Sequence, residues 1–487
     1  MASIEVSSNA ADFLADAVTV VIVARKADLA DGWVTANLPQ AIRDTANLLA
    51  TEAKSGGAVL STLLPAGAGA RTLMLVPLHD KISRHLSETR SYEIFTALRN
   101  TARPDNGKVA IVLGLADEQH AMGATLGIVR AYPLYSRKSG NKNQQGTVKI
   151  LLQTRNGHLQ NGFETLHSGR DAVMLAQRLV DMPTMELDTG VFEAEARAAV
   201  EHLPHVTVES IVGDDLLTAG LRGLHAVGRT GMVAPRLVIM DYNPPGASGK
   251  PIALIGKGLV YDTGGLSLKI VGDRMLTMKC DMGGAAAVLG AFQMLAKNGC
   301  GKRVIAALSM AENSIGPNSY RPDDVIEMHS GKTMEVNNTD AEGRIALADA
   351  ASYIARKHAP RILIDAATLT GAQLIATGKW HAGLVCNDAD LEAAALKAGL
   401  QCGDHAMPML FSPELHMGEY KSAVADMRNS VADRNNASAS ASGLWVYMHI
   451  DDLDLKWLHI DLAGPAFLDN RGTGYGVGLI YTVVAGM

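Results

Sequence analysis

Five apolar runs in the second half of the chain have the length and composition of buried β-strands. They lie at 235–243, 251–262, 303–313, 361–369 and 457–464. Several are apolar without alternation, which is typical of strands that are covered on both faces of a sheet. Segments with a helical pattern of small apolar residues lie between them, among them 283–299 and 343–358. Strands that alternate with helices in this way predict an α/β domain.

The first third of the chain shows the same alternation. Strand-like runs at 18–24, 72–78, 108–114 and 147–153 lie around helix-like stretches such as 38–54. We therefore expect a smaller α/β domain over 1–160 and a larger one over 161–487, with the boundary in the polar stretch that ends at Gly162. Three further polar or low-complexity stretches are expected to be loops: 136–146, 432–442 and 469–478.

Composition excludes several classes of protein. Of the 487 residues, 47% are hydrophobic and 19% are charged, as in ordinary globular proteins, and a net charge of −6 argues against a dominant nucleic-acid surface. The four cysteines have no CxxC spacing, so we expect free thiols in a reducing, cytoplasmic compartment. The apolar run at 17–24 is far shorter than the roughly 20 residues of a membrane span, and we expect no membrane segment.

Charged residues gather next to the ends of predicted strands and the beginnings of predicted helices. In open α/β sheets, ligands bind at the carboxyl ends of the strands. The residues are Lys257, Asp262 and Lys269 in and after one strand, Asp281 before one helix, and Asp340, Glu342 and Arg344 at the start of another.

Four carboxylates would share one site if these stretches converge. Two like charges about 4 Å apart repel by about 4 kcal/mol at an effective dielectric constant of about 20. Two divalent metals would balance the four negative charges, and Zn²⁺ accepts carboxylate ligands. Metals roughly 3.5–4 Å apart are a recurring hydrolytic device, because they polarise a carbonyl and activate a water. The sequence therefore predicts a two-metal hydrolytic site.

The basic residues have roles in such a site. Lys257 could ligate a metal as a neutral amine, because burial and positive neighbours lower its pKa. Lys269 would stay charged and stabilise a tetrahedral intermediate, and Arg344, in the first turn of its helix, would bind an anion. We expect an extended segment from Asp340, with its charged residues on one face and Gly343 allowing the backbone to turn.

Each stretch also has a purely structural interpretation. "GKG" at 256–258 could be an exposed turn, "DMGG" at 281–284 a helix cap, and "NTDAEGR" at 338–344 a capped loop. The histidines offer no HExxH pattern, and we interpret the isolated His329, His381, His449 and His459 as structural.

These stretches resemble the leucyl aminopeptidase family, the two-zinc cytosolic aminopeptidases. "NTDAEGR" is similar to that family's signature. Four more segments resemble family segments in the same order: "GKGLVYDTGGLSLK" (256–269), "MKCDMGGAAAV" (278–288), "DAATLTGA" (365–372) and "HIDLAGPAF" (459–467).

The resemblance implies a metal-dependent aminopeptidase that acts on peptides with a free N-terminus. It implies a macro-like N-terminal α/β domain, a mixed sheet in the catalytic domain, and a homohexamer. Zinc is the favoured metal, with manganese, cobalt or magnesium as alternatives at the more exchangeable position. The implied ligands are Lys257, Asp262, Asp281 and Glu342 for the tighter zinc, and Asp262, Asp340 and Glu342 for the exchangeable metal.

The resemblance also implies catalytic and substrate-binding residues. Lys269 and Arg344 match the family's catalytic pair, with a bicarbonate at Arg344 as general base. The α-amine of the substrate would bind a metal and Asp281. The implied substrate-binding residues are Lys269, Met278, Asp281, Thr368, Leu369, Gly371 and Ala463, with the backbone of Thr368 and Leu369 holding the substrate.

Two departures and two alternatives remain. Lys269 and Asp281 are twelve residues apart, one more than is usual in the family, so the loop at 270–277 must bulge. Ala466 falls where some members have a larger pocket residue, which leaves a leucine preference open. Binding of ADP-ribose or DNA by the first domain is disfavoured, since only "PAGAGART" at 65–72 indicates it. An inactive scaffold is disfavoured because every ligand residue is present.

Overall fold

The computed structural model describes residues 3–7, 14, 17–66, 69–101, 108–133, 135–139, 146–269 and 275–487. The expected loops at 136–146 and 270–277, and the stretch at 65–72, lie partly outside these residues. The chain divides into two compact units. Unit 1 comprises Met1–Met174 with Gly399–Asp404, and unit 2 comprises Leu175–Ala398 with His405–Met487.

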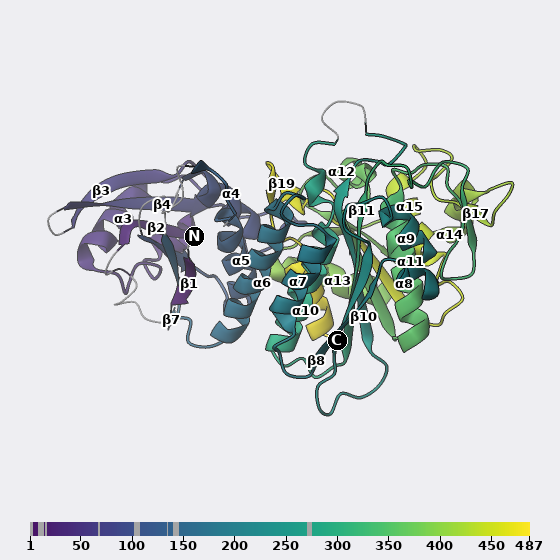
Figure 1. Cartoon of the computed structure of the whole chain (residues 1–487). Coiled ribbons are helices and arrows are strands. Elements are labelled where there is room, and N and C mark those ends of the chain that lie inside the picture. Colours follow the sequence, from purple (N-terminus) through teal and green to yellow (C-terminus); the bar gives the residue numbers. More distant parts are fainter. Residues whose placement is uncertain are drawn as a thin grey trace. The chain divides into compact units, whose positions relative to one another are not determined.

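Unit 1 is built around a seven-stranded sheet (Figure 1). Its elements are β1 (Ser3–Ser7), β2 (Ala17–Arg25), α2 (Lys26–Ala30), α3 (Gln40–Glu52), β3 (Leu60–Ala66), β4 (Gly69–Leu78), α4 (Ser91–Thr101), β5 (Lys108–Gly114), η1 (Glu118–His120), α5 (Ala121–Ala131), β6 (Thr147–Thr154) and β7 (Gly157–His158). The strand order is β1-β6-β5-β2-β4-β3, with β7 beside β6. The central strand β2 is parallel to both β4 and β5. Its apolar residues and those of α3 share one hydrophobic core.

The sheet of unit 2 is mixed. Its central strands are β18 (Lys456–Asp461), β14 (Ile362–Ala367), β10 (Ile252–Asp262) and β11 (Val304–Asn313), which are parallel neighbours in that order. Antiparallel pairing adds β9 (Arg236–Tyr242) and β8 (Val206–Val212) beyond β11, and β15 (Ala382–Cys386) beyond β18. The outermost strand, β16 (Ala406–Pro408), is parallel to β15. The predicted α/β class, with a mixed sheet in the larger part, is confirmed.

Helices cover both faces of this sheet. Figure 1 shows α10 (Gly283–Lys297) on one face and α11 (Glu342–His358) on the other. All of β10 except Tyr261 is buried, which explains why its sequence is apolar without alternation. A Cβ on Gly284 would lie only 2.1 Å from the carbonyl oxygen of Ala366, so glycine there lets α10 approach the sheet closely.

The other elements surround this core. They are α6 (Phe163–Asp181), which runs past the division at Met174, α13 (Ala389–Cys402), whose last residues from Gly399 onward belong to unit 1, and, in unit 2, α7 (Thr189–Val200), α8 (Asp215–Thr218), α9 (Arg222–Gly228), η3 (Met278–Cys280), β12 (Val325–Glu327), β13 (Thr333–Glu335), α12 (Gly371–Ala376), α14 (Pro413–His416), η4 (Met417–Tyr420), β17 (Met427–Arg428), α15 (Ser438–Tyr447), β19 (Phe467–Leu468), β20 (Arg471–Gly472) and α16 (Val477–Ala485). No helix within the described ranges is both long enough and apolar enough to cross a membrane.

Two loop predictions were partly wrong. The stretch 432–442 contains the first half of α15, because its alanines and serines are buried as a helix against the sheet. The stretch 469–478 contains β20 and the beginning of α16. Small residues permit close packing, so these low-complexity sequences belong to packed helices and a strand as well as to loops.

Candidate metal centre

The stretches that carry the predicted ligands meet at the carboxyl end of β10. Lys257 Nζ lies 2.8 Å from Asp281 Oδ1 and 3.1 Å from Glu342 Oε1. Lys269 Nζ lies 2.7 Å from Asp262 Oδ2 and 2.5 Å from the Oδ1 atom of Asp340. Two lysines therefore connect four carboxylates that come from three separate parts of the sequence.

The donor atoms fit a divalent cation. Asp262, Asp340 and Glu342 each offer a carboxylate oxygen, and these oxygens lie within 4.8 Å of one another. Asp281 Oδ2 and Glu342 Oε2 are buried without a hydrogen-bond partner among the described residues. Buried carboxylate oxygens need compensation, and oxygen donors suit zinc, manganese and magnesium. The residues present therefore fit the metals that the resemblance implies.

The charge of the cluster is also unbalanced. Two ammonium groups face four carboxylates, which leaves two negative charges. Burial, together with Glu342, raises the pKa of Asp262 to about 6, and burial raises that of Asp281 to about 8 against the effect of Lys257. Burial by itself lowers the pKa of Lys257, but Asp281 and Glu342 outweigh it and raise that pKa above its usual value. Additional positive charge would relieve this repulsion.

Asn313 holds one of the carboxylates in place, although the sequence did not single it out. Its Nδ2 donates to Asp262 Oδ1 at 2.7 Å and to the Thr339 carbonyl at 3.0 Å. The backbone N–H of Gly264 donates to the same Asp262 oxygen at 2.8 Å. With Oδ1 engaged in this way, Oδ2 is the oxygen that reaches Lys269. The sequence signal that could have identified Asn313 is its position at the end of the strand that pairs with β10.

The start of α11 differs from the prediction of an extended segment, which is wrong. Asp340 lies in a turn and Glu342 is the first residue of the helix. Glu342 and Arg344 are therefore about 200° apart around the helix axis. A Cβ on Gly343 would lie 2.5 Å from both Cε and Nζ of Lys257. The backbone at Gly343 is already helical, so glycine is not needed there for the predicted turn. It is needed because it lets the Lys257 side chain approach closely.

The Arg344 side chain is buried and held by segments far along the chain. Its Nη1 donates to the Asn429 carbonyl at 3.0 Å and to the Tyr420 hydroxyl at 3.4 Å. Its Nη2 donates to Ser442 Oγ at 2.8 Å. Its Nε is buried, with no hydrogen-bond partner in the ranges that the structure describes. Ser442 belongs to the stretch predicted to be a loop, and no sequence pattern marked Tyr420 or Asn429.

The end of β14 adds Thr368 to the cluster. Its hydroxyl donates to Asp281 Oδ1 at 2.8 Å, and its carbonyl accepts from Lys257 Nζ at 3.1 Å. The N–H of Leu369 donates to Asp461 at 3.1 Å. These backbone groups, which the resemblance assigns to the substrate, thus have partners within the chain. Thr368 fixes the Asp281 oxygen that faces Lys257.

The remaining predicted pocket residues lie in nearby segments. The N–H of Ala463 donates to the Asp461 carboxylate at 3.2 Å. Met278 begins η3 and is half-buried, and Gly371 begins α12 with open space where a Cβ would lie. A Cβ on Gly283 would lie 3.2 Å from both Ala466 and Thr368, so these two side chains flank the start of α10.

Three of the isolated histidines have protein partners that account for them. His459 Nδ1 lies 2.5 Å from Asp365 Oδ1, His449 Nδ1 2.7 Å from Ser330 Oγ, and His329 Nδ1 3.0 Å from Ser352 Oγ. His381 has its ring 5.3 Å from that of His405.

Comparison with known proteins places this site in context. Residues 174–481 match the model of the cytosol aminopeptidase family, catalytic domain. A probable aminopeptidase, NPEPL1, from Homo sapiens is 42% identical over 436 residues, 87% of this chain and 82% of that protein. Leucine aminopeptidase 1 of Caenorhabditis elegans is 37% identical over 413 residues, 84% of this chain and 83% of that protein. The leucyl aminopeptidase of Trypanosoma brucei in complex with actinonin superimposes with a TM-score of 0.91 at 33% identity, covering 100% of this chain and 96% of that one.

Proposed function

Because the chain belongs to the cytosol aminopeptidase family and is an aminopeptidase, we propose that it removes the N-terminal amino acid from peptides with a two-metal centre in unit 2. The family resemblance noted in the sequence is confirmed by these matches. The observation that carries the proposal is the cluster itself, in which four carboxylates and two lysines meet at the carboxyl end of β10.

Five residues would hold the two metals. Lys257, Asp262, Asp281 and Glu342 would hold the tighter zinc. Asp262, Asp340 and Glu342, whose oxygens lie within 4.8 Å of one another, would hold the exchangeable metal, which could be zinc, manganese, cobalt or magnesium. When bound, such metals polarise a carbonyl and lower the pKa of a coordinated water.

Two basic side chains would assist. Lys269 Nζ, between Asp262 and Asp340, would bring positive charge to the oxygen that becomes negative during attack. Arg344 would hold a bicarbonate through Nε, its one nitrogen without a partner in the described part of the chain, and this anion would serve as general base. The surrounding hydrogen bonds fix the guanidinium, so this anion site is organised before substrate binds.

The free N-terminus of the substrate would determine which peptide bond is cleaved. Asp281 Oδ2, buried and without a partner, would accept from the α-amine. Met278, Thr368, Gly371 and Ala463 would line the pocket for the first side chain, with the backbone at Leu369 nearby. The small side chain of Ala466 beside Thr368 leaves the preferred residue to be measured.

Assembly and location follow the same proposal. We propose a homohexamer that acts in the cytoplasm. The four cysteines are free thiols, as expected in a reducing compartment.

One assay tests the activity. Pure protein loaded with zinc, manganese or cobalt should hydrolyse fluorogenic aminoacyl amides, and a chelator should abolish turnover. Bestatin and actinonin, each bound in a structure of the Trypanosoma brucei enzyme, should inhibit it. If every aminoacyl amide remained intact with all three metals, the proposed activity would be rejected.

One substitution tests the site. Asp340→Ala should lose the exchangeable metal and lower kcat/KM by roughly a thousandfold, since a Lewis-acid metal contributes several kcal/mol. Metal content by mass spectrometry and turnover are measured together. Asp390→Ala, at an exposed aspartate of α13, is the matched control. Full turnover in Asp340→Ala would contradict the ligand assignment.

A further inference from the structure

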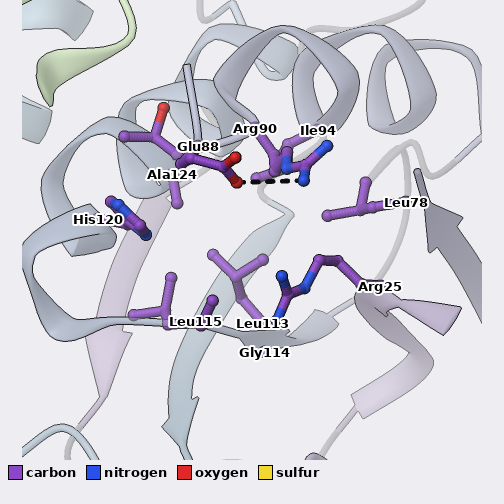
Figure 2. Close-up of a pocket in the computed structure, with 12 residues that line it drawn as sticks. Arg25, Leu78, Glu88, Arg90, Ile94, Leu113, Gly114, Leu115, His120 and Ala124 are labelled. Carbon is purple, nitrogen blue, oxygen red and sulfur yellow. Dashed lines mark hydrogen bonds and ion pairs between the residues drawn. The ribbon is translucent and has the colours of Figure 1, made fainter. Parts of the chain in front are cut away.

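Unit 1 contains a pocket at the carboxyl ends of three neighbouring parallel strands (Figure 2). Arg25 ends β2, Leu78 ends β4 and Gly114 ends β5, and all three line the pocket. Residues that precede or open α4 and α5 complete the lining. With Glu88 beside Arg90, the cavity volume of the pocket is about 20 Å³, which is room for about one water molecule. It is separate from the metal centre, whose residues all belong to unit 2.

The strand order places this pocket where the chain connections diverge. From β2 the chain passes through α3 and β3 to β4 on one side, whereas β5 on the other side of β2 is followed by α5 and β6. The loops after β2 and β5 therefore lead to opposite edges of the sheet and leave a crevice between them. Such crevices at the carboxyl ends of parallel strands are the general ligand site of open α/β sheets.

Arg90 is the buried cation of the pocket. Its side chain is only 5% exposed, and its Nε and Nη1 are buried without a hydrogen-bond partner in the described part of unit 1. Nη2 donates to Glu88 Oε2 at 3.1 Å and to the Asp80 carbonyl at 3.4 Å, while Nη1 lies 3.7 Å from Glu93 Oε2. Arg90 also has a φ of +58°, a conformation that residues other than glycine seldom adopt. Such backbone geometry is typical of places where a side chain is held for binding.

His120 and Arg25 also line this pocket. His120 Nδ1 is buried and has no hydrogen-bond partner among the residues described, and burial lowers the pKa of this ring. Arg25 lies across the pocket, where its Nε and one terminal nitrogen donate to Asp28 at 2.6 and 2.9 Å. Figure 2 shows Arg25, Arg90 and His120 arranged around the open space, with the Glu88 carboxylate at its edge.

The ion pair between Glu88 and Arg90 leaves Glu88 open to water, so an incoming anion can replace this carboxylate. Its side chain is 56% exposed, whereas that of Arg90 is 5% exposed. Releasing an exposed carboxylate to water costs little, because such pairs contribute weakly to stability. An oxyanion entering the pocket could bridge several guanidinium nitrogens at once, which one glutamate at the rim does not do. Apolar side chains, among them Ile94, Leu113 and Leu115, form the remaining wall.

We propose that this pocket binds a phosphate or carboxylate group, which enters as the exposed Glu88 side chain swings out to water, with Arg90 holding the oxyanion in place of Glu88 and His120 donating to it. The site is independent of the peptidase centre.

Equilibrium dialysis of the full-length, metal-loaded protein tests this with two probes, inorganic phosphate and succinate. Glu88→Gln removes the competing carboxylate from an exposed position, so it should tighten oxyanion binding roughly two- to fivefold, the range expected for one exposed ion pair. Arg90→Gln should abolish this binding. Glu118→Gln, at an exposed glutamate of η1 outside the pocket, controls for a general change of charge and should leave affinity unchanged. Hydrolysis of an aminoacyl amide should be the same in all four proteins.

The outcomes separate the alternatives. Tighter binding in Glu88→Gln supports the site, and the probe with the larger response identifies phosphate or carboxylate as the group recognised. Equal binding in wild type, Glu88→Gln and Arg90→Gln would overturn it, because any anion bound would then lie elsewhere, including at the metal centre. Absence of binding of both probes to Glu88→Gln would overturn it as well. If Arg90→Gln fails to fold, His120→Gln takes its place, with weaker binding expected.

Discussion

At the residue scale, the metal centre depends on which oxygen each carboxylate presents. Asp262 has one oxygen engaged by Asn313 and Gly264, and its other oxygen faces Lys269. Thr368 does the same for Asp281, because its hydroxyl binds Oδ1 and leaves Oδ2 buried without a partner. Neighbouring side chains of this kind orient ligands and typically change metal affinity when they are removed.

Asn313→Ala tests this positioning. The substitution should weaken metal binding roughly 10- to 100-fold, the usual effect of losing a group that orients a ligand. Titration calorimetry of metal into the chelated protein measures it without reference to turnover. Asn298→Ala, which removes an asparagine that donates to the Tyr481 hydroxyl in the same unit, should bind metal normally. Unchanged metal affinity in Asn313→Ala would exclude the positioning role.

The ligand candidates could be found in the sequence because each lies in a short segment of unusual charge. Their partners could not. Asn313 meets Asp262 because β10 and β11 align these two residues as neighbours, and strand register is not visible in a local pattern. Tyr420, Asn429 and Ser442 are ordinary residue types brought to Arg344 from 76, 85 and 98 positions away.

At the scale of elements, α11 is the support of the site. Ser309 on β11 donates to the Ala346 carbonyl, and Asp349 accepts from the N–H groups of Leu224 and His329. The helix is therefore anchored to the sheet, to α9 and to the loop after β12. This explains how its first residue, Glu342, can hold a charged group in a buried position.

Gly343→Ala tests the contact between α11 and β10. Alanine favours helix over glycine by about 1 kcal/mol, so a simple helix effect would stabilise the protein. The added Cβ would instead meet Lys257 at 2.5 Å and displace its Nζ from Asp281 and Glu342. We expect at least a tenfold loss of metal affinity and of kcat/KM, measured by calorimetry and by peptidase assay.

Gly418→Ala is the matched control, since nothing lies within 4 Å of its Cβ position in η4. Normal metal affinity in Gly343→Ala would show that Lys257 can move aside without consequence.

Some elements could be predicted from the sequence and others could not, for the same reason as the residues of the site. Buried strands are continuous apolar runs and the body of α11 has a helical pattern, whereas the turn before α11 and the helix in 432–442 are set by packing and have no such local signal.

At the scale of the whole molecule, stability should depend on pH through His449. This side chain is buried with its Nδ1 2.7 Å from Ser330 Oγ, the cations Lys332 and Arg356 act on it, and its Nε2 has no hydrogen-bond partner among the described residues. Burial lowers its pKa to about 3 from the ordinary 6.5. Above pH 6.5 both folded and unfolded chains hold a neutral ring. As pH falls from 6.5 towards 3, only the unfolded chain gains the proton, so the folded state loses stability.

His449→Gln should therefore have a flatter pH profile than wild type. The difference between the two proteins should change by up to about 1.4 kcal/mol per pH unit below pH 6.5. Thermal unfolding of the metal-loaded proteins at pH 7.5, 6.5 and 5.5 measures it. Parallel profiles for the two proteins would exclude His449 as the source.

The proposed hexamer is also a property of the whole molecule. Sedimentation equilibrium should give about six times the chain mass of 51.4 kDa. A single species near 51.4 kDa would contradict the proposal. The α/β class was predictable because strand and helix periodicities are local, but the number of subunits depends on surfaces that no periodicity describes.

The composition of unit 1 has a consequence for the order in which the chain can fold during synthesis. The segment Gly399–Asp404 belongs to unit 1, although its other residues end at Met174. Asp404 is fully buried and lies 2.5 Å from Arg130, and the hydroxyls of Ser87 and Ser91 donate to the Leu400 and Gly403 carbonyls. During synthesis, more than 220 residues after Met174 must therefore be added before the ion pair between Arg130 and Asp404 can form. A gene fragment that ends at Met174 would lack these contacts of unit 1, so we expect Met174 to be a poor place to cut the gene.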